Sequence, residues 1–407
     1  MQLPQNPFTF NPVGRDLFTG RKDELALVYH VSHEAMKSSR SRIIVVTGPR
    51  GIGKTSFLDL IRGGNISAAS DDVVDLAVFE PVFSKLEKIT SRELHDVIDI
   101  GVVKLLGGYH KRYKLLYGMK RFFRAFEGGI FGTMIKFSDN VSMEDLLRRL
   151  RSASGAIVKL QRPAVLTILL DEMDPHLKVA EGLPDFIRSC AEHVLCPLVF
   201  LLAGLPPAWN SLREAHPSIP RTADHIQLKP LQRNEVDQLM QTAVGLANRT
   251  AAVRIALAPG ASDLIFELTG GHPSLVQILG YRSVEKLLQN LKDEPEPKPT
   301  QTSITKDVIA HAQRLADLGT RVFDGWVHDL ADTEKRVLWQ IASLQKGQHQ
   351  IDATQIQPTA TSRAQVLDAL KMLRDEWGLL DLNNQIISRA FLTWLKSTPI
   401  KSPAEST

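Results

Sequence analysis

One nine-residue stretch constrains the fold of this chain more than any other. Residues 48–56 read GPRGIGKTS and contain the full G-x-x-x-x-G-K-[ST] spacing of a phosphate-binding loop. The apolar, β-branched run at 42–47 (RIIVVT) predicts a buried parallel strand before the loop, and the apolar periodicity that begins at Ser56 predicts a helix after it. Strand, glycine loop and helix form the context that the motif requires, so the sequence predicts a nucleoside triphosphate site rather than a plain glycine turn.

The residue types in this loop match the chemistry of phosphate binding. Glycines let the backbone curl until its N–H groups point at the β-phosphate, beside the positive end of the following helix. Lys54 is expected to reach the β- and γ-phosphates, and the Thr55 hydroxyl to hold Mg²⁺. The residues expected around the phosphates are Gly48, Pro49, Arg50, Gly51, Ile52, Gly53, Lys54, Thr55 and Ser56.

A second motif supplies the acids that such a site needs. Residues 164–170 (AVLTILL) predict a buried strand that ends in Asp171 and Glu172, which is the Walker B pattern. Asp171 is expected to hold Mg²⁺, partly through water, and Glu172 to act as the general base that orients the attacking water. The alternative is that these acids only cap the next helix.

Further apolar segments predict the fold class. Strands are expected within 73–83, 198–204 and 225–228, separated by helical segments. With the strands before the loop and the acids, five candidates amount to an α/β fold with a parallel-sheet P-loop NTPase core.

Composition bounds the class of protein. A chain of 407 residues suits two or three domains, and a net charge of only +4 does not by itself demand a nucleic-acid partner. The two cysteines, Cys190 and Cys196, lack the spacing of a metal or redox motif and indicate a reducing compartment. Because no apolar run reaches membrane-spanning length and the first residues do not resemble a signal peptide, we expect a cytoplasmic protein without membrane contact.

The stretch 111–126 mixes basic and aromatic residues and has two interpretations. Its Lys and Arg side chains, within 111–124, could neutralise DNA phosphates while the aromatic rings stack on bases. Alternatively, it is an amphipathic helix with an apolar core face and a solvated basic edge. The helical spacing of its apolar positions favours the core helix.

Taken together, these segments resemble a known family. The set Phe18-x-Gly20-Arg21, GPRGIGKT, LLDEMD, RTADHIQLKPL at 221–231 and GGHP at 270–273 is similar to P-loop ATPases of the AAA+ and STAND groups. Nearest are the archaeal-type ATPases and the relatives of origin-recognition initiators. The resemblance covers roughly residues 6–395, with the two Walker motifs as its specific part.

The resemblance implies roles for residues outside those motifs. It implies that His272 and Pro273, at the start of a lid helix, approach the nucleotide, although His272 is equally typical of an ordinary turn. Arg221 matches the position of an arginine finger that reaches a neighbouring subunit, or it is a surface arginine. The polar sensor after the fourth strand is replaced by Ala203, Gly204 and Leu205, and Ser274, Leu275 and Val276 stand where initiators place a lid arginine.

The chain divides into predicted domains. A leading segment and helix at 1–40 precede an ATPase core at 41–230 and a helical lid at 231–290. A Pro- and charge-rich linker at 291–302 leads to residues 303–398, whose helices and final hairpin predict a winged helix, before a disordered tail at 399–407. Because the candidate recognition helix carries balanced charges, DNA contact and a protein-docking or autoinhibitory role stay open for this domain.

The sequence therefore predicts an ATP- and Mg²⁺-dependent ATPase. By the resemblance, it would self-assemble into a homo-oligomer when ATP is bound and act with DNA. The alternative is a regulatory protein that binds nucleotide, turns it over negligibly and signals to a protein partner through its winged helix. The missing sensor residues favour the alternative, and the intact Asp171 and Glu172 favour hydrolysis.

Overall fold

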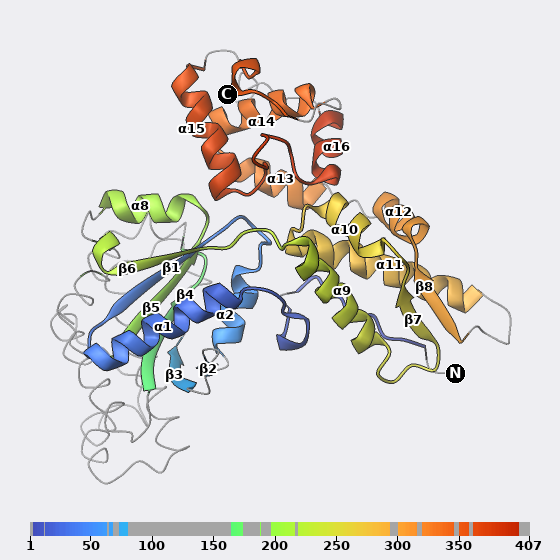
Figure 1. Ribbon diagram of the computed structural model, residues 1–407, viewed down its shortest axis with the longest axis horizontal. Helices are drawn as coiled ribbons and strands as arrows, with labels where there is room; N and C mark the ends of the chain where they lie inside the picture. Colours follow the sequence, from blue (N-terminus) through green and yellow to red (C-terminus); the bar gives the residue numbers. More distant parts are fainter. Residues whose placement is uncertain are drawn as a thin grey trace, which may run out of the picture. The chain divides into compact units, whose positions relative to one another are not determined.

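The computed structural model describes residues 3–11, 13–62, 65–67, 73–79, 164–173, 188, 197–215, 219–293, 300–315, 320–345, 350–357 and 361–398 (Figure 1). The predicted basic and aromatic stretch at 111–126, the two cysteines and the terminal tail lie outside these residues. The chain forms two compact units, one of residues 21–47 and 57–226 and the other of residues 1–20, 48–56 and 227–407. Among the described residues, no helix has both the length and the apolar character that a membrane crossing requires.

The first unit is built on a six-stranded sheet of order β2-β3-β4-β5-β1-β6. Strands β3, β4, β5 and β1 pair in parallel, and the short β2 pairs antiparallel with β3. The strands are β1 (Arg42–Thr47), β2 (Asn65–Ser67), β3 (Val73–Phe79), β4 (Ala164–Leu170), β5 (Leu198–Gly204) and β6 (Ala223–Gln227). The parallel sheet confirms the predicted α/β class, and the edge strand β2 is a feature that the sequence did not reveal.

The central strands are apolar along their whole length because both faces are covered. Every residue of β5 is buried, and so are the last five of β1. Helix α1 (Lys22–Ser38) packs along the sheet with its buried positions at helical spacing, namely Val28, Tyr29, Val31, Ser32 and Ala35. Helix α8 (Pro207–Ala215) also contacts β1 and β5.

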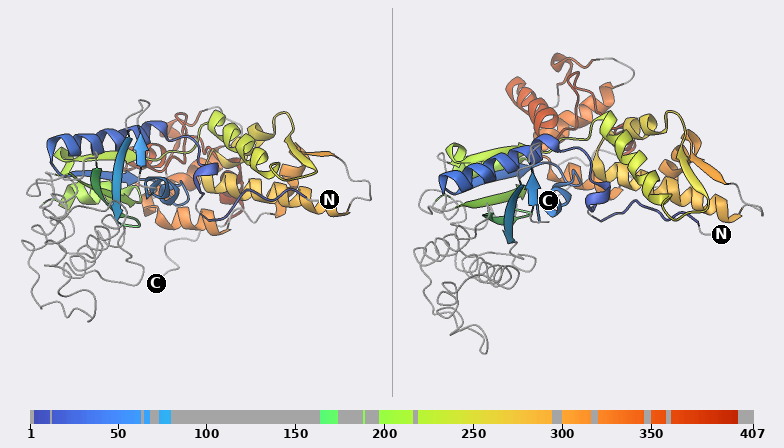
Figure 2. Two further views of the ribbon diagram at one scale, coloured as in Figure 1. Left: turned by 90° about the horizontal axis from the view of Figure 1, so that it is seen from below. Right: turned by 60° about the horizontal axis from the view of Figure 1, so that its bottom comes forward.

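The second unit contains the predicted lid, which is not entirely helical. The helices that begin within its range are α9 (Arg233–Ala247), α10 (Ala261–Thr269) and α11 (Pro273–Asp293). Helix α12 (Lys306–Leu315), which falls in the predicted winged-helix range, contacts α10 and α11. Strand β7 (Arg254–Leu257) pairs in parallel with β8 (Gln301–Ile304), so the expectation of helix throughout 231–290 is wrong there. The two strands lie side by side next to these helices, and β8 begins within the predicted linker (Figure 1, Figure 2).

The C-terminal part of this unit follows the predicted order of helices and hairpin. Its elements are α13 (Thr320–Asp329), α14 (Asp332–Leu344), α15 (Arg363–Lys371), a π-helical turn (Met372–Glu376) and α16 (Arg389–Ser397). Between the last two, Leu380 and Ile386 form an antiparallel bridge around a turn in which Asn384 has φ 57°. The Ser388 hydroxyl accepts from the N–H of Phe391 at 3.1 Å and donates to the carbonyl of Leu268 at 2.8 Å, which ties α16 to α10.

The N-terminal segment follows helix α11. The Asn6 side-chain amide donates to the carbonyl of Tyr281 at 2.9 Å. Phe8 packs on Gly280, where a Cβ atom would come within 2.6 Å of the phenyl ring. The close approach explains why a glycine stands in the middle of this helix.

Candidate nucleotide-binding site

The glycine loop has the backbone conformation that its sequence predicts. Gly51 and Gly53 adopt φ values of 76° and 98°, in the region that only glycine enters without strain. At Gly48, a Cβ atom would lie 2.8 Å from the Ile52 side chain and 3.1 Å from the carbonyl of Leu228. Each of the three glycines of the motif therefore has a conformational or steric reason to be present.

Lys54 and Thr55 begin helix α2 (Lys54–Arg62), directly after the loop. The Lys54 ammonium donates to the carbonyls of Gly48 at 2.7 Å and Pro49 at 3.1 Å. It thus lies over the curve of the loop, where it can exchange these carbonyls for phosphate oxygens. Ser56 is buried, and its hydroxyl accepts from the N–H of Val13 at 3.0 Å, so this end of the motif contacts the N-terminal segment.

The start of helix α11 lies against the same loop. Pro273 is its first residue, as the sequence predicts, and the N–H of Ser274 donates to the carbonyl of Gly51 at 3.2 Å. His272 is 3% exposed, and its Nδ1 lies 3.1 Å from the Ser274 hydroxyl. A Cβ atom on Gly51 would lie 2.5 Å from that hydroxyl oxygen and 3.1 Å from His272 Cε1. The structure therefore brings His272 and Pro273 together with the loop.

The backbone before His272 is fixed by an equally close approach. Gly271 has φ 74°, and its carbonyl accepts from the N–H of Leu231 at 2.8 Å. A Cβ atom at this position would lie 2.0 Å from the Leu231 carbonyl oxygen. No side chain fits there, so the glycine pair that precedes His272 is a structural requirement.

A contact that sequence reasoning missed joins the loop to helix α13. The indole N–H of Trp326 donates to the carbonyl of Arg50 at 3.1 Å. The guanidinium of Arg50 pairs with Asp329, with 2.5 Å from Nε to Oδ2 and 3.4 Å from Nη2 to Oδ1. Trp326 also packs on His272, with ring centroids 4.4 Å apart, so one helix contacts two of the predicted nucleotide residues.

The Walker B acids belong to the first unit, at the carboxyl edge of its sheet. Strand β5 pairs with β4 on one side and β1 on the other, with Leu170 opposite Leu202 and Thr47 opposite Gly204. The chain leaves β4 at Asp171 and leaves β1 for the glycine loop, so both departures occur at the same edge of the sheet.

Glu172 has an unusual backbone. Its φ is 54°, its side chain is exposed, and its N–H donates to Oδ1 of Asp171 at 2.9 Å. A non-glycine residue in the left-handed region costs about 1–2 kcal/mol. Such strain is often found where a side chain must be presented for function, and here it presents a carboxylate to solvent.

A partly buried polar contact holds the last residue of β1. The Thr47 hydroxyl lies 2.7 Å from Nε2 of His225, whose ring stacks on Trp209 with centroids 4.8 Å apart. Burial lowers the pKa of His225 below its ordinary value of 6.5, so the ring is neutral at pH 7. Sequence reasoning placed His225 in a strand but found no signal for this pairing.

Two other predicted features are the candidate arginine finger and the position of the missing sensor after β5. Arg221 ends a short 3-10 turn (Ile219–Arg221) and is exposed, as both a finger and a surface arginine would be. At the end of β5, the carbonyl of Ala203 accepts from the N–H of Met173 at 2.9 Å. The backbone thus continues its pairing where many such ATPases carry a polar sensor.

The donor types fit a hard divalent cation. Thr55 offers a hydroxyl oxygen and Asp171 a carboxylate, the ligands that Mg²⁺ takes together with water and phosphate. No cluster of three or more His, Cys, Asp or Glu side chains gathers in the part of the chain that the structure describes. A magnesium ion held mainly by phosphates and water does not require such a cluster.

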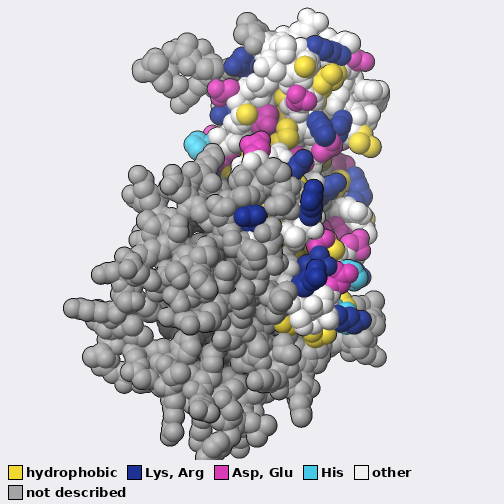
Figure 3. All heavy atoms as spheres, turned by 90° about the vertical axis from the view of Figure 1, so that its left-hand side faces the viewer, with side chains coloured by type: hydrophobic (Ala, Val, Ile, Leu, Met, Phe, Trp, Pro, Cys, Tyr) yellow, Lys and Arg dark blue, Asp and Glu magenta, His cyan; other side chains and the backbone are white. Residues whose placement is uncertain are grey.

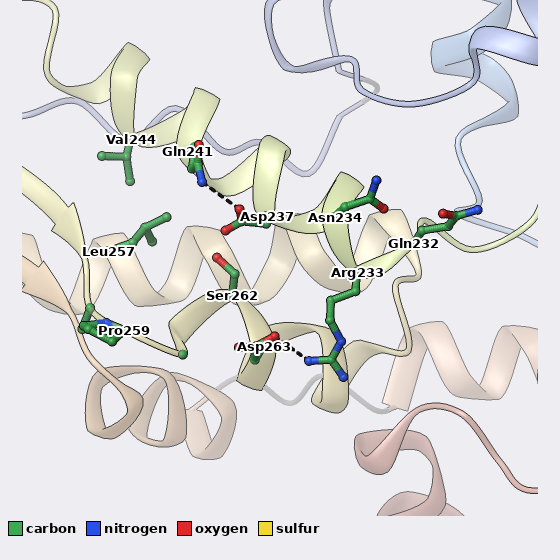
Figure 4. A pocket seen from close by; sticks show the side chains of 12 residues that line it. Gln232, Arg233, Asn234, Asp237, Gln241, Val244, Leu257, Pro259, Ser262 and Asp263 are labelled. Carbon is green, nitrogen blue, oxygen red and sulfur yellow. Dashed lines mark hydrogen bonds and ion pairs between the residues drawn. The ribbon is translucent and has the colours of Figure 1, made fainter.

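The lid carries a separate, open hollow of about 930 Å³ between α9 and α10 (Figure 4). Polar and apolar side chains both line it, and Arg233 of α9 pairs there with Asp263 of α10 at 2.5 Å. None of the predicted phosphate-binding residues lines it.

Solved structures align with this chain over nearly its whole length. The Aeropyrum pernix ORC2 protein, in its ADPNP–ADP complexes, aligns with a TM-score of 0.54 and 13% identity over 97% of each chain. The Aeropyrum pernix ORC1 protein in complex with DNA gives a TM-score of 0.44 and 14% identity over 96% of this chain and 94% of that one. A Thermotoga maritima RuvB variant gives 0.43 and 15% identity over 96% and 99%.

No protein-family model matches this chain, and no curated protein matches it in sequence. The structural likeness to the ORC2 protein nevertheless shows that this chain shares the fold of that protein, in agreement with the predicted parallel-sheet α/β class. The particular resemblance to origin-recognition relatives that the sequence suggested is therefore confirmed at the level of the fold.

Proposed function

We propose that this protein is a Mg²⁺-dependent ATPase that works as a nucleotide-controlled switch. The observation that carries the proposal is the glycine loop, whose positive-φ glycines and Lys54 form a phosphate cradle at the start of α2. The ORC2 protein, which shares the fold, was solved with ADPNP and ADP, and this supports nucleotide binding here.

Each group of the site has a task in hydrolysis. Lys54 and the loop N–H groups bind the β- and γ-phosphates. Thr55 and Asp171 would hold the cation, which would supply positive charge beside the phosphates. Glu172 accepts the proton of the attacking water, because its exposed carboxylate follows Asp171 directly. The proposal includes self-assembly when ATP is bound, with Arg221 reaching the γ-phosphate in a neighbouring subunit as an arginine finger.

DNA is the proposed polynucleotide partner, contacted through residues 111–124 and the C-terminal domain. The helix order α13, α14, α15 and the bridged hairpin support a winged helix there. The residues that replace the two sensors, 203–205 and 274–276, indicate slow turnover unless a partner stimulates it. Two cysteines without motif spacing suit the cytoplasm.

The test is steady-state ATP hydrolysis with and without double-stranded DNA, at low and moderate salt. Wild-type turnover should depend on Mg²⁺, rise with DNA and lose that stimulation as salt increases. Glu172→Gln should bind ATP without hydrolysing it, and Lys54→Ala should bind weakly. Turnover that survives in Glu172→Gln would refute the assigned base.

Two exposed leucines of the C-terminal domain favour a second function. On the C-terminal domain, Leu382 at the hairpin is 86% exposed and Leu367 on α15 is 48% exposed. Acidic side chains also lie among the basic ones on the described part of the face in Figure 3. Exposed leucines and mixed charge suit a protein partner better than a phosphate backbone.

The rival is therefore a regulatory protein that binds nucleotide tightly, turns it over negligibly and signals through this domain. It predicts no response to DNA in the same assay. Stoichiometric ADP or ATP binding with no turnover, with or without DNA, would decide for the rival.

A further inference from the structure

Helix α13 contacts the phosphate loop at Arg50, through both the side chain and the main chain of that residue. Asp329 pairs with the guanidinium of Arg50 across 279 residues of sequence, and Trp326 donates to the Arg50 carbonyl. Gly325 lies one turn before Asp329 on the same helix, and a Cβ atom at this position would be 3.8 Å from Cδ of Arg50. All these residues belong to the same compact unit.

The ion pair has the burial expected of a specific contact. The Asp329 side chain is 5% exposed, whereas Arg50 is 59% exposed. A carboxylate that has lost its water is strongly destabilised if its partner leaves, so Asp329 holds Arg50 firmly as long as α13 stays in place. His328, the preceding residue of α13, also lies beside Asp329, with its Nδ1 3.4 Å from Oδ1 and its ring 87% exposed.

The main-chain contacts fix the loop as well. The carbonyls on both sides of the Gly51 Cα are occupied, that of Arg50 by Trp326 and that of Gly51 by the N–H of Ser274. Because a trans peptide is planar, a bonded carbonyl sets the direction of the N–H in the same peptide. The Gly51 N–H, one of the groups expected to bind phosphate, therefore points away from Trp326.

We propose that α13 is a nucleotide-sensitive latch in which Arg50 exchanges Asp329 for the γ-phosphate of ATP. This inference rests on the proposed nucleotide site. ATP offers the guanidinium a new anion and so favours release of α13, whereas ADP lacks that anion and leaves the latch closed. By reciprocity, whatever weakens the latch must raise the affinity for ATP by the same factor.

The experiment compares affinities for a non-hydrolysable ATP analogue and for ADP, measured by titration calorimetry. Asp329→Asn keeps the shape of the side chain but removes its charge. We expect it to bind the ATP analogue about tenfold more tightly, within the usual range of allosteric coupling, and ADP as the wild type does. In the Arg50→Ala background the same substitution should change neither affinity.

The matched control is Glu267→Gln. It removes the ion pair between Glu267 on α10 and Arg389 on α16, at 3.6 Å, which joins the lid to the C-terminal domain without touching the loop. This variant should bind both nucleotides as the wild type does. Hydrogen exchange supplies a second readout, because residues 320–329 should lose protection with the ATP analogue and with Asp329→Asn, but not with ADP.

The outcomes separate the two proposals. An unchanged or lowered affinity of Asp329→Asn for the ATP analogue would overturn the latch, as would a gain that persists in Arg50→Ala. A similar gain in Glu267→Gln would also overturn it, because loosening of the whole domain would then explain the effect. If the wild type bound neither nucleotide, the proposed function itself would fail, and the latch with it.

Discussion

Replacing Glu172 by glycine should stabilise the protein while it abolishes turnover. Glu172 has φ 54°, and the left-handed region costs a residue with a Cβ atom about 1–2 kcal/mol. Glycine removes that cost but adds about 0.4–1 kcal/mol of backbone entropy to the unfolded chain. The N–H bond to Asp171 survives the substitution, so the net gain is about 0.5–1 kcal/mol.

Calorimetric melting measures this gain. For a folding unit of about 200 residues, 1 kcal/mol corresponds to a shift of about 2–4 °C, so Glu172→Gly should melt about 1–4 °C above the wild type. Glu172→Gln is the matched control, because it keeps the Cβ atom and the backbone cost, and its melting temperature should stay at the wild-type value. Both variants should lose hydrolysis. A glycine variant no more stable than the glutamine variant would refute the argument from strain.

Two further predictions concern stability. Gly271→Ala should destabilise the protein by about 3 kcal/mol, because its Cβ atom would overlap the Leu231 carbonyl and its φ is positive. The control Gly245→Ala, at an exposed position of helix α9, should leave the melting temperature unchanged or raise it slightly. Burial lowers the pKa of His225 in the folded state, so as the pH falls the unfolded chain binds a proton at this residue before the folded chain does. The free energy of unfolding should therefore fall as the pH drops below about 6.5. This loss should be smaller in His225→Gln. Unfolding midpoints at pH 7.5 and 5.5 measure this loss, and an equal loss in both proteins would contradict it.

The sequence predicts those parts of the molecule whose signals are local. The glycine loop, the buried strands and the acids after β4 each depend on a few adjacent residues, and the structure places them as the patterns predict. Pro273 opening α11 is a signal of the same kind, because its fixed φ and missing N–H suit the first turn of a helix. In all of these, a few adjacent residues carry the signal for the local conformation.

The lid was mispredicted because its strands depend on distant pairing. Residues 254–257 and 301–304 are four-residue strands, too short to show a period against helical neighbours. Each becomes a strand only because the other lies beside it, after α10 and α11 have brought the chain back. The edge strand β2 escaped prediction for the same reason, since its three residues are defined by pairing with β3.

Arg50 makes the limit of sequence reasoning most apparent. Its place in the motif assigns it to the phosphates, but nothing in the motif says that its guanidinium rests on Asp329, 279 residues away. An acid and a tryptophan three residues apart on a helix are ordinary in any amphipathic segment, and only packing against the loop gives them a role. In this proposal, a phosphate and Asp329 compete for one guanidinium. The motif then determines which parts of the nucleotide are bound. Helix α13 determines how much of the free energy of binding goes into releasing the C-terminal domain. Lys54→Ala and Asp329→Asn should therefore differ in kind, because the first loses binding of both nucleotides and the second changes only the preference between them.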